Sequence, residues 1–440
     1  MIRVRAAVFA AKVRFAEFGP GYQNPWMLQV INPAIRNRLI AVIFAVSSLV
    51  AAAQVAYFTL MPIIAADLGG SESAAGIPST MGLLFRAASA YPLGWLMGRF
   101  GRRMGLTLGL VVGLIGTAMS AWAIGAELFW VFSLGAGLAG VARGAADLSR
   151  YAAAEVSPLE RRAKVLGWIV FAGTIGALAG PLLVTPAVNL AGARGLVPDS
   201  GPFWAAAFVS GLSAVVTFLF LRPDPLTISR MMDANDRVTA GRTSDEPARP
   251  LSELMKAWHV RLGMAAMTIG QLVMVMIMVI TPLHMDHSGH GTGSISFVIL
   301  AHQLGMFGLS WATGGLIDRF GATRLIVAGA ALLIVSSLLS PVVTSVAGLS
   351  LALFLLGLGW NFCFVAGSAL LAMGLAPNER TGVQGISDTW SSAASALGSL
   401  STGLLFAAGE MLLVGAVGLA FSLGLVAAWL IARNRHLVIA

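Results

Sequence analysis

The chain is poor in charge and nearly free of cysteine. Only 11% of its 440 residues are charged and 57% are hydrophobic, whereas about a quarter of the residues of a soluble protein are charged. This balance excludes an ordinary soluble protein. The single cysteine, Cys363, excludes an internal disulfide and a metal site built from cysteine alone.

The sequence also lacks the motifs of an enzyme. It has no Ser-His-Asp arrangement, no phosphate-binding Gly-Lys loop, no pair of catalytic carboxylates and no nucleotide-binding domain that would drive a pump with ATP. We therefore predict that the protein is not an enzyme and has no resident cofactor.

Long apolar runs dominate what is present. A helix that crosses a bilayer needs about 20 mostly apolar residues, and the runs are continuous rather than alternating as in barrel strands. Twelve such windows lie near 39–62, 75–97, 105–125, 128–152, 164–187, 203–221, 260–284, 294–316, 325–341, 347–373, 384–407 and 411–432. The sequence predicts an all-α membrane protein with twelve transmembrane helices.

The distribution of Lys and Arg predicts the orientation, because these residues accumulate in cytoplasmic loops. With the N-terminus inside, the opposite face has Arg194 alone. Both termini are then cytoplasmic, the membrane is the inner membrane of a bacterium, and the +9 net charge reflects topology rather than nucleic-acid binding. We predict a monomer in the lipid bilayer, divided into an N-terminal tail (1–38), a six-helix half (39–221), a cytoplasmic linker (222–259), a second six-helix half (260–432) and a C-terminal tail (433–440).

One signature occurs twice, 220 residues apart. The first copy contains Gly94, Gly98, Arg99, Gly101, Arg102 and Arg103, and the second contains Gly314, Asp318, Arg319, Gly321 and Arg324. A second pair of similar segments, which begin at Pro158 and Pro377, is 219 residues apart. The sequence is thus an internal duplication of two halves.

The duplicated signature resembles the loop between helices 2 and 3 of the major facilitator superfamily of secondary transporters. The resemblance implies two pseudo-symmetric halves that alternate access to a site near the middle of the bilayer, and loops that act as a gate, in which an acidic residue caps a helix N-terminus. The second copy keeps the acid as Asp318, but the first has Gly98 in its place. We expect the gate of the N-terminal half to be weakened or differently arranged.

A glycine and proline pattern in the fifth window is similar to one associated in this superfamily with proton-coupled antiporters. It consists of Gly176, Gly180 and Pro181. Helix packing alone also explains such residues in a membrane helix, so both interpretations remain open.

Ionisable side chains inside the predicted helices should have a partner or a function, because an unpaired charge in hydrocarbon costs several kcal/mol. Arg86 has no acid within a turn on its own helix, and it either faces the substrate or bonds to a neighbouring helix. Arg143 and Asp147 are four residues apart and predict an ion pair. Asp388 falls near the start of its window, where the helix dipole would stabilise a carboxylate. Asp147 and Asp388 are the acidic candidates for proton coupling.

Methionine and histidine concentrate between residues 255 and 306. Met264, Met267, Gln271, Met274 and Met278 fall on one face of a helix. His302 and Met306 share a face of the next helix, and His287 and His290 lie in the loop between the two. Thioether and imidazole suit copper, although a methionine stripe also packs cores and lines apolar pockets.

Met-x-x-x-Met on helix 7 followed by His-x-x-x-Met on helix 8 resembles the CcoA-type copper importers of bacteria. The resemblance implies a copper path in which His287 and His290 gather the ion and Met274, Met278, His302 and Met306 pass it inward. The alternatives are a proton-coupled exporter of amphipathic organic compounds, with Phe307, Trp311, Trp360 and Phe364 as its pocket, and a transporter-like sensor.

Overall fold

The structure is a computed structural model that describes residues 33–157, 159–230, 249–373, 375 and 377–434. These residues form helices without a single strand, which confirms the predicted all-α class. In chain order the elements are α3 (Pro33–Gly69), η1 (Glu72–Ala74), α4 (Ile77–Phe100), α5 (Arg102–Gly125), α6 (Phe129–Glu155), α7 (Leu159–Ala193), η2 (Pro198–Ser200), α8 (Gly201–Phe220), α10 (Leu251–Leu254), α11 (Trp258–His287), α12 (Thr292–Gln303), η3 (Leu304–Gly308), α13 (Ser310–Phe320), α14 (Ala322–Leu339), α15 (Val346–Ala372) and α16 (Pro377–Asn434).

In the described residues, nine helices are long and apolar enough to cross a membrane. The bent pair α12 and α13 adds a tenth span. The 58-residue α16 contains two arms joined at Gly409 and Glu410, and α4 is a further helix of 24 residues. With the arms of α16 counted separately and α4 included, the described part of the chain accounts for the twelve predicted helices.

The eighth span is broken rather than straight. A π-helical segment, η3, separates α12 from α13, and the two helices meet at 51°. Asn361 of α15 stabilises the break, because its amide donates to the carbonyl of Met306 (2.7 Å) and to Ser310 Oγ (2.8 Å), while Thr313 donates to its Oδ1 (2.6 Å). The window 294–316 predicted a single helix, because the bonds that compensate the break come from a distant part of the sequence.

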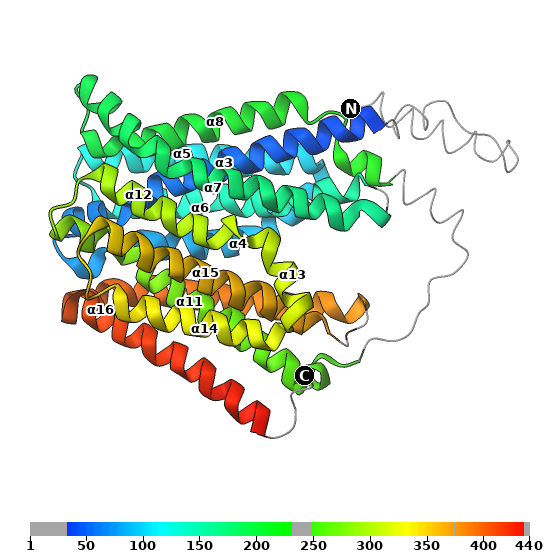
Figure 1. The fold of residues 1–440 in the computed structure, drawn as a ribbon. Coiled ribbons are helices and arrows are strands. Elements are labelled where there is room, and N and C mark those ends of the chain that lie inside the picture. Colours follow the sequence, from blue (N-terminus) through cyan, green and yellow to red (C-terminus); the bar gives the residue numbers. More distant parts are fainter. Residues whose placement is uncertain (1–32, 158, 231–248, 374, 376, 435–440) are drawn as a thin grey trace, which may run out of the picture.

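The helices form two bundles, α3 to α8 and α11 to α16, that lie one above the other in Figure 1. Helices α4 and α16 pack against each other across the boundary, as do α7 and α12. The first residues of α3 and the last of α16 lie at the same end (Figure 1), together with the α4–α5 loop and its arginines. We call this the basic end and the opposite one the acidic end.

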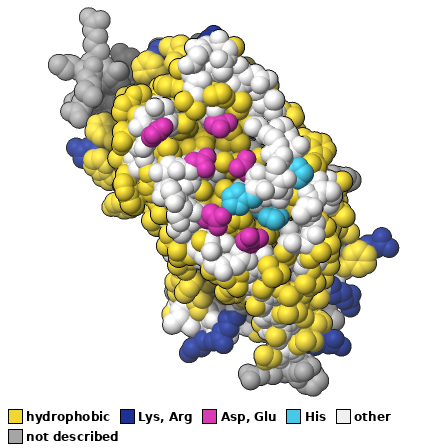
Figure 2. All heavy atoms as spheres, turned by 90° about the vertical axis from the view of Figure 1, so that its left-hand side faces the viewer, with side chains coloured by type: hydrophobic (Ala, Val, Ile, Leu, Met, Phe, Trp, Pro, Cys, Tyr) yellow, Lys and Arg dark blue, Asp and Glu magenta, His cyan; other side chains and the backbone are white. Residues whose placement is uncertain are grey.

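The acidic end is shown in Figure 2, where carboxylates and histidines gather and basic side chains are sparse. Its carboxylates belong to the loops and helix ends there, namely Asp67, Glu72, Glu127, Asp199, Asp286 and Glu410. Glu72, Phe406 and Glu410 line a hollow of about 460 Å³. The charge asymmetry along the bundle axis is the one that the Lys and Arg distribution predicts.

The glycines of the fifth window allow α7 to pack directly on α3. A Cβ at Gly176 would lie 1.9 Å from the carbonyl oxygen of Ser48, and one at Gly180 would lie 2.7 Å from the Cβ of Val55. Ser48 also donates to the carbonyl of Ala172 at 2.7 Å. Close backbone approach therefore explains both glycines, and it leaves the antiport interpretation a prediction. Pro181 lies within the same helix.

We expect Gly176→Ala to destabilise the protein by about 1–3 kcal/mol, because overpacking forces the two helices apart. Gly173→Ala is the matched control, since a Cβ there meets nothing within 4 Å. Thermal unfolding of both variants in detergent measures the difference. Equal melting temperatures for the two variants would contradict the packing role.

Candidate functional site

The N-terminal half contains a cluster of charges within the spans. Arg86 on α4 reaches Asp147 on α6, and both its Nε and its Nη2 lie 2.7 Å from Asp147 Oδ2. Arg143, one turn before Asp147, places its Nε 3.3 Å from Oδ1. The expected pair of Arg143 and Asp147 is therefore present, and Arg86 has found its partner on a neighbouring helix. The carboxylate of Asp147 is thus paired with two guanidinium groups.

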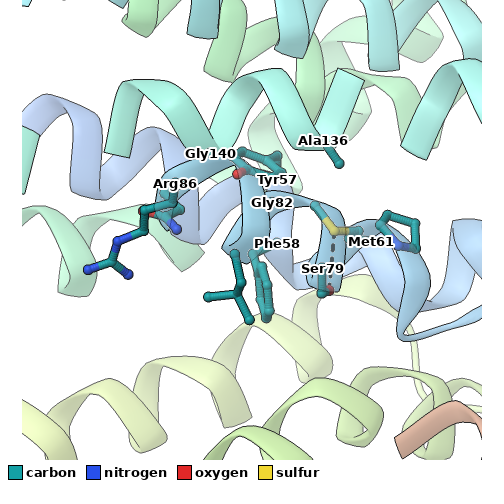
Figure 3. Close-up of a pocket in the computed structure, with 11 residues that line it drawn as sticks. Tyr57, Phe58, Met61, Ser79, Gly82, Arg86, Ala136 and Gly140 are labelled. Atoms are coloured by element: carbon teal, nitrogen blue, oxygen red, sulfur yellow. Dashed lines mark hydrogen bonds between the residues drawn. The ribbon is translucent and has the colours of Figure 1, made fainter. Parts of the chain in front are cut away.

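A small cavity of about 30 Å³ adjoins this cluster (Figure 3). Arg86 lies at one end of it, and Met61 and Ser79 lie at the other, where the hydroxyl of Ser79 donates to the sulfur of Met61 at 3.4 Å. Gln54 also lines the cavity, and its buried Oε1 has no hydrogen-bond partner in the described part of the chain. The cavity has room for about one water molecule, beside a guanidinium group and an amide oxygen.

The C-terminal half contains an aromatic cluster. Trp360 and Phe364, one turn apart on α15, stack with ring centroids 5.0 Å apart and planes 20° apart, and Phe307 meets Trp360 edge-on at 6.0 Å. Gln271 on α11 accepts the indole N–H of Trp360 at 2.7 Å. The cluster is partly exposed. It brings together Phe307, Trp360 and Phe364, three of the four residues expected for an organic pocket, and the side chain of Trp311 lies outside the described part.

The two features border one hydrophobic core. Phe58 lines the cavity and packs against the core of the C-terminal half, the same core against which Phe307 and Trp360 pack. The polar cavity and the aromatic cluster therefore flank the boundary between the halves.

The predicted copper ligands inside the bundle belong to this core. Met274, Met278 and Met306 are at most 9% exposed and pack with aliphatic side chains. His302 is fully buried, and its Nδ1 lies 3.0 Å from the carbonyl of Leu353 on α15. Helix α12 packs mainly on α15 rather than on α11, so the two ligand motifs lie on helices with few contacts to each other.

The predicted loop ligands are engaged separately. His287 Nδ1 lies 3.6 Å from Glu72 Oε1, and the Nε2 of His290 lies 2.6 Å from the carbonyl of Thr344. No group of three or more His, Cys, Asp or Glu side chains within the described ranges could hold a metal ion. The interpretation that His287 and His290 gather copper together is not supported, because each ring contacts a different element.

The first gating loop is capped by a residue that the sequence analysis missed. Asp224, which follows α8, accepts the backbone N–H groups of Arg102 and Arg103 at 3.0 Å each, at the N-terminus of α5. Gly101 has φ +103°, and a Cβ there would lie 2.3 Å from Asp224 Oδ2. The expectation of a different arrangement fits this geometry, since the carboxylate comes from the segment that follows α8 rather than from position 98.

The arginines of that loop have partners in their own half. Arg102 forms two bonds with Glu155 at the end of α6, at 2.6 and 2.9 Å. Arg103 lies over the ring of Phe218 at 5.3 Å, and Arg99 lies over that of Trp95 at 5.6 Å. Gly94 and Gly98 have no atom within 4 Å of a built Cβ, so neither glycine is required by close contact in this state.

The second copy repeats the backbone but not the cap. Gly321 has φ +84°, which matches Gly101 in its left-handed conformation. Asp318 is exposed and forms no ion pair within the described part of the chain, and Arg319 lies over Phe320 at 5.2 Å. Gly314 and Arg324 are exposed as well.

A second unpredicted contact holds the other end of the linker. Arg249 forms two bonds of 2.8 Å with the carboxylate of Glu379 in the first turn of α16. The bonds to Glu379 raise the pKa of Arg249. Glu379 is 5% exposed. The sequence did mark the region of Glu379, because the segment that begins at Pro377 repeats the one that begins at Pro158.

The expectation that Asp388 caps its helix is wrong. Helix α16 begins at Pro377, eleven residues earlier, so Asp388 lies three turns inside the helix and Glu379 occupies the first turn. The first turns of α16 are polar, so the window of apolar residues, 384–407, began after the true start of the helix. Asp388 is exposed.

The halves contact each other toward the acidic end. Ser399 Oγ donates to the carbonyl of Gly76 at 3.1 Å, and Thr80 Oγ1 to that of Ala396 at 3.4 Å. Along the face of α4 that begins with Thr80, exposure rises from 7% at Thr80 to 54% at Leu84 and 83% at Tyr91. Helices α4 and α16 therefore separate toward the basic end, and the site is open on that side.

Comparisons with known proteins agree with this architecture. The family profile described as Major Facilitator Superfamily matches residues 43–399. The chain is 33% identical over 384 residues to the uncharacterized MFS-type transporter YdeG of Bacillus subtilis (86% of this chain, 87% of the relative) and 27% identical over 359 residues to the riboflavin transporter RfnT of Brucella anthropi (80% and 85%). The crystal structure of a D-xylose-proton symporter superposes with a TM-score of 0.68 at 16% identity, covering 88% of this chain and 96% of that one, and it supports the fold.

We expect Asp147→Asn to lower stability by about 1–2 kcal/mol, because Arg86 and Arg143 then lose their shared carboxylate in a partly exposed site. Thermal unfolding in detergent measures this loss. The double variant Arg86→Gln/Asp147→Asn should recover part of it, since one of the unpaired charges is removed. An Asp147→Asn protein as stable as the parent would contradict the role of this pair.

Removal of the cap on α5 should also be measurable. Asp224→Ala is expected to cost about 1 kcal/mol, the usual value of a lost N-terminal cap, and to speed hydrogen exchange at the amides of Arg102 and Arg103. Asp318→Ala is the matched control, because this carboxylate occupies the acid position of the second copy and forms no ion pair with the described residues. An equal effect of the two substitutions would argue against the cap.

Proposed function

The chain belongs to the Major Facilitator Superfamily of transporters, and we propose that it carries a small organic molecule with a planar ring between its two halves. The stacked pair Trp360 and Phe364, joined to Gln271, is the observation that carries this proposal. The protein is a transporter rather than an enzyme, as its relatives and fold establish.

Alternating access explains the contacts between the halves. They touch near Gly76 and Ser399 and separate toward the basic end. Because arginine and lysine accumulate on the cytoplasmic side, the basic end faces the cytoplasm in our proposal. The structure is then an inward-facing state, ready to release or accept substrate there.

The chemistry of the boundary favours a flat ligand with polar edges. Aromatic faces stack with planar rings and add about 0.5–1.5 kcal/mol beyond burial. Gln271 offers an amide group to ring nitrogens and carbonyls, and Arg86 offers a partly exposed guanidinium group. The name of the relative RfnT, a riboflavin transporter, supports a ligand of this class.

Copper is the weaker candidate for the cargo. Thioethers and an imidazole are present on α11 and α12, and the contact of His302 Nδ1 with Leu353 leaves Nε2 without a hydrogen-bond partner among the described residues, but the three methionines pack in an apolar core. The two ligand motifs lie on helices with few contacts to each other, whereas the aromatic cluster is already assembled.

We expect cells that lack flavin uptake to take up labelled riboflavin when they express the parent chain, and to lose at least about tenfold of that uptake with Trp360→Ala. This loss corresponds to about 1.4 kcal/mol of binding energy. Trp360→Phe should retain most of the activity because a ring remains. Trp390→Ala is the matched control, since that indole is 58% exposed.

Cellular copper content in the same strains separates the two cargoes. Parent-dependent copper accumulation that disappears with His302→Ala, without flavin uptake, would reject the organic substrate. Uptake of neither cargo at normal membrane levels would reject both.

A further inference from the structure

The charge cluster of the N-terminal half has a surplus of positive charge. Asp147 is the carboxylate shared by Arg86 and Arg143, and Arg150 follows on the same helix, where its Nη2 lies 3.1 Å from the hydroxyl of Tyr151. Three guanidinium groups thus accompany one carboxylate. Water can screen this surplus while the basic end is open, because the side chain of Arg86 is 39% exposed. Closing the basic end removes that water, and an uncompensated charge is costly to desolvate.

The register of α4 and α16 places a carboxylate opposite this surplus. The helices are antiparallel, and Thr80 bonds to Ala396. At 1.5 Å per residue, Arg86 lies about 9 Å and Asp388 about 12 Å from that contact, both toward the basic end. The two side chains therefore belong to the same level of the bundle, on opposite halves.

Asp388 also lies on the face of α16 that meets α4. It precedes Ser399 by eleven residues, which is a rotation of about 20° at 100° per residue, and Ser399 is the residue that bonds to Gly76. Among the described residues, Asp388 is exposed without a hydrogen bond or ion pair, and the charges in electrostatic range of it are Arg150, Arg86 and Asp147.

We propose that Asp388 is the counter-ion that closes the basic end, and that Arg86 is shared between Asp147 and Asp388 when α4 and α16 come together there. In the open state Arg86 bonds to Asp147 within its own half. In the closed state the second carboxylate neutralises the surplus charge that closure buries. The role does not depend on which substrate is carried, because all the groups belong to the protein.

Cross-linking measures the closed state directly. Tyr91 and Gln384 continue the same register toward the basic end, and both are exposed in the open state. The chain with Tyr91→Cys and Gln384→Cys, in a Cys363→Ser background and in lipid nanodiscs, is treated with a short bis-maleimide. We expect it to cross-link, and Asp388→Asn to lower the yield about fivefold, which corresponds to about 1 kcal/mol lost from the closed state.

Two matched variants control for changes in the helix itself. Asp388→Glu keeps the charge and should retain the yield, and Thr389→Val alters the neighbouring exposed position without changing charge. A parent chain that never cross-links would refute the register, and an Asp388→Asn chain that cross-links like the parent would refute the counter-ion. Charge-dependent cross-linking in a protein without flavin uptake would keep this proposal and reject only the proposed substrate.

Discussion

A charged side chain within a bilayer must find a counter-charge, and this requirement organises the centre of the protein. It explains why Arg86 crosses from α4 to Asp147 on α6, and why Arg143 approaches the same carboxylate. Each such bond also fixes the relative position of two helices. The ion cluster is therefore a constraint on the packing of the half that carries it.

The two halves repeat a backbone but stabilise it with different side chains. Gly101 and Gly321 adopt the same left-handed conformation at equivalent loops. The first loop is held by Asp224, at the start of the linker, and the far end of the linker is held by Arg249 on Glu379. Each end of the connecting segment is thus fastened to the half that it adjoins.

The sequence predicts the architecture well because the bilayer imposes long apolar runs and an asymmetric distribution of arginine. It also predicts the pair of Arg143 and Asp147, since four residues along a helix bring two side chains together. Partners on distant segments could not be read from spacing. Asp224 sits in a short polar stretch after α8, and Asn361 resembles any polar residue in an apolar helix until the break at η3 is seen.

The methionine stripe shows the limit of periodicity as evidence. The spacing of Met274 and Met278 correctly places both on one helix face. Spacing alone does not predict which residues pack against that face. In the structure it packs in an aliphatic core. The aromatic cluster on which the proposed function rests joins Gln271, Phe307 and Trp360 from three elements. No local sequence pattern predicts such a cluster.

The direct contact between the backbones of Gly76 and Ser399 would serve as the fulcrum of a tilt of α4 against α16. A Cβ at Gly76 would lie 1.8 Å from the carbonyl oxygen of Ser399, so the two backbones touch with no side chain between them. Phe100, at the far end of α4, is about 36 Å from this point at 1.5 Å per residue, and a tilt of about 15° moves it by about 9 Å. Such a tilt can shut the basic end while the fulcrum stays intact, whereas opening the acidic end requires the fulcrum to break. This geometry allows a form in which both ends are closed, because the basic end can shut before the contact between Gly76 and Ser399 breaks.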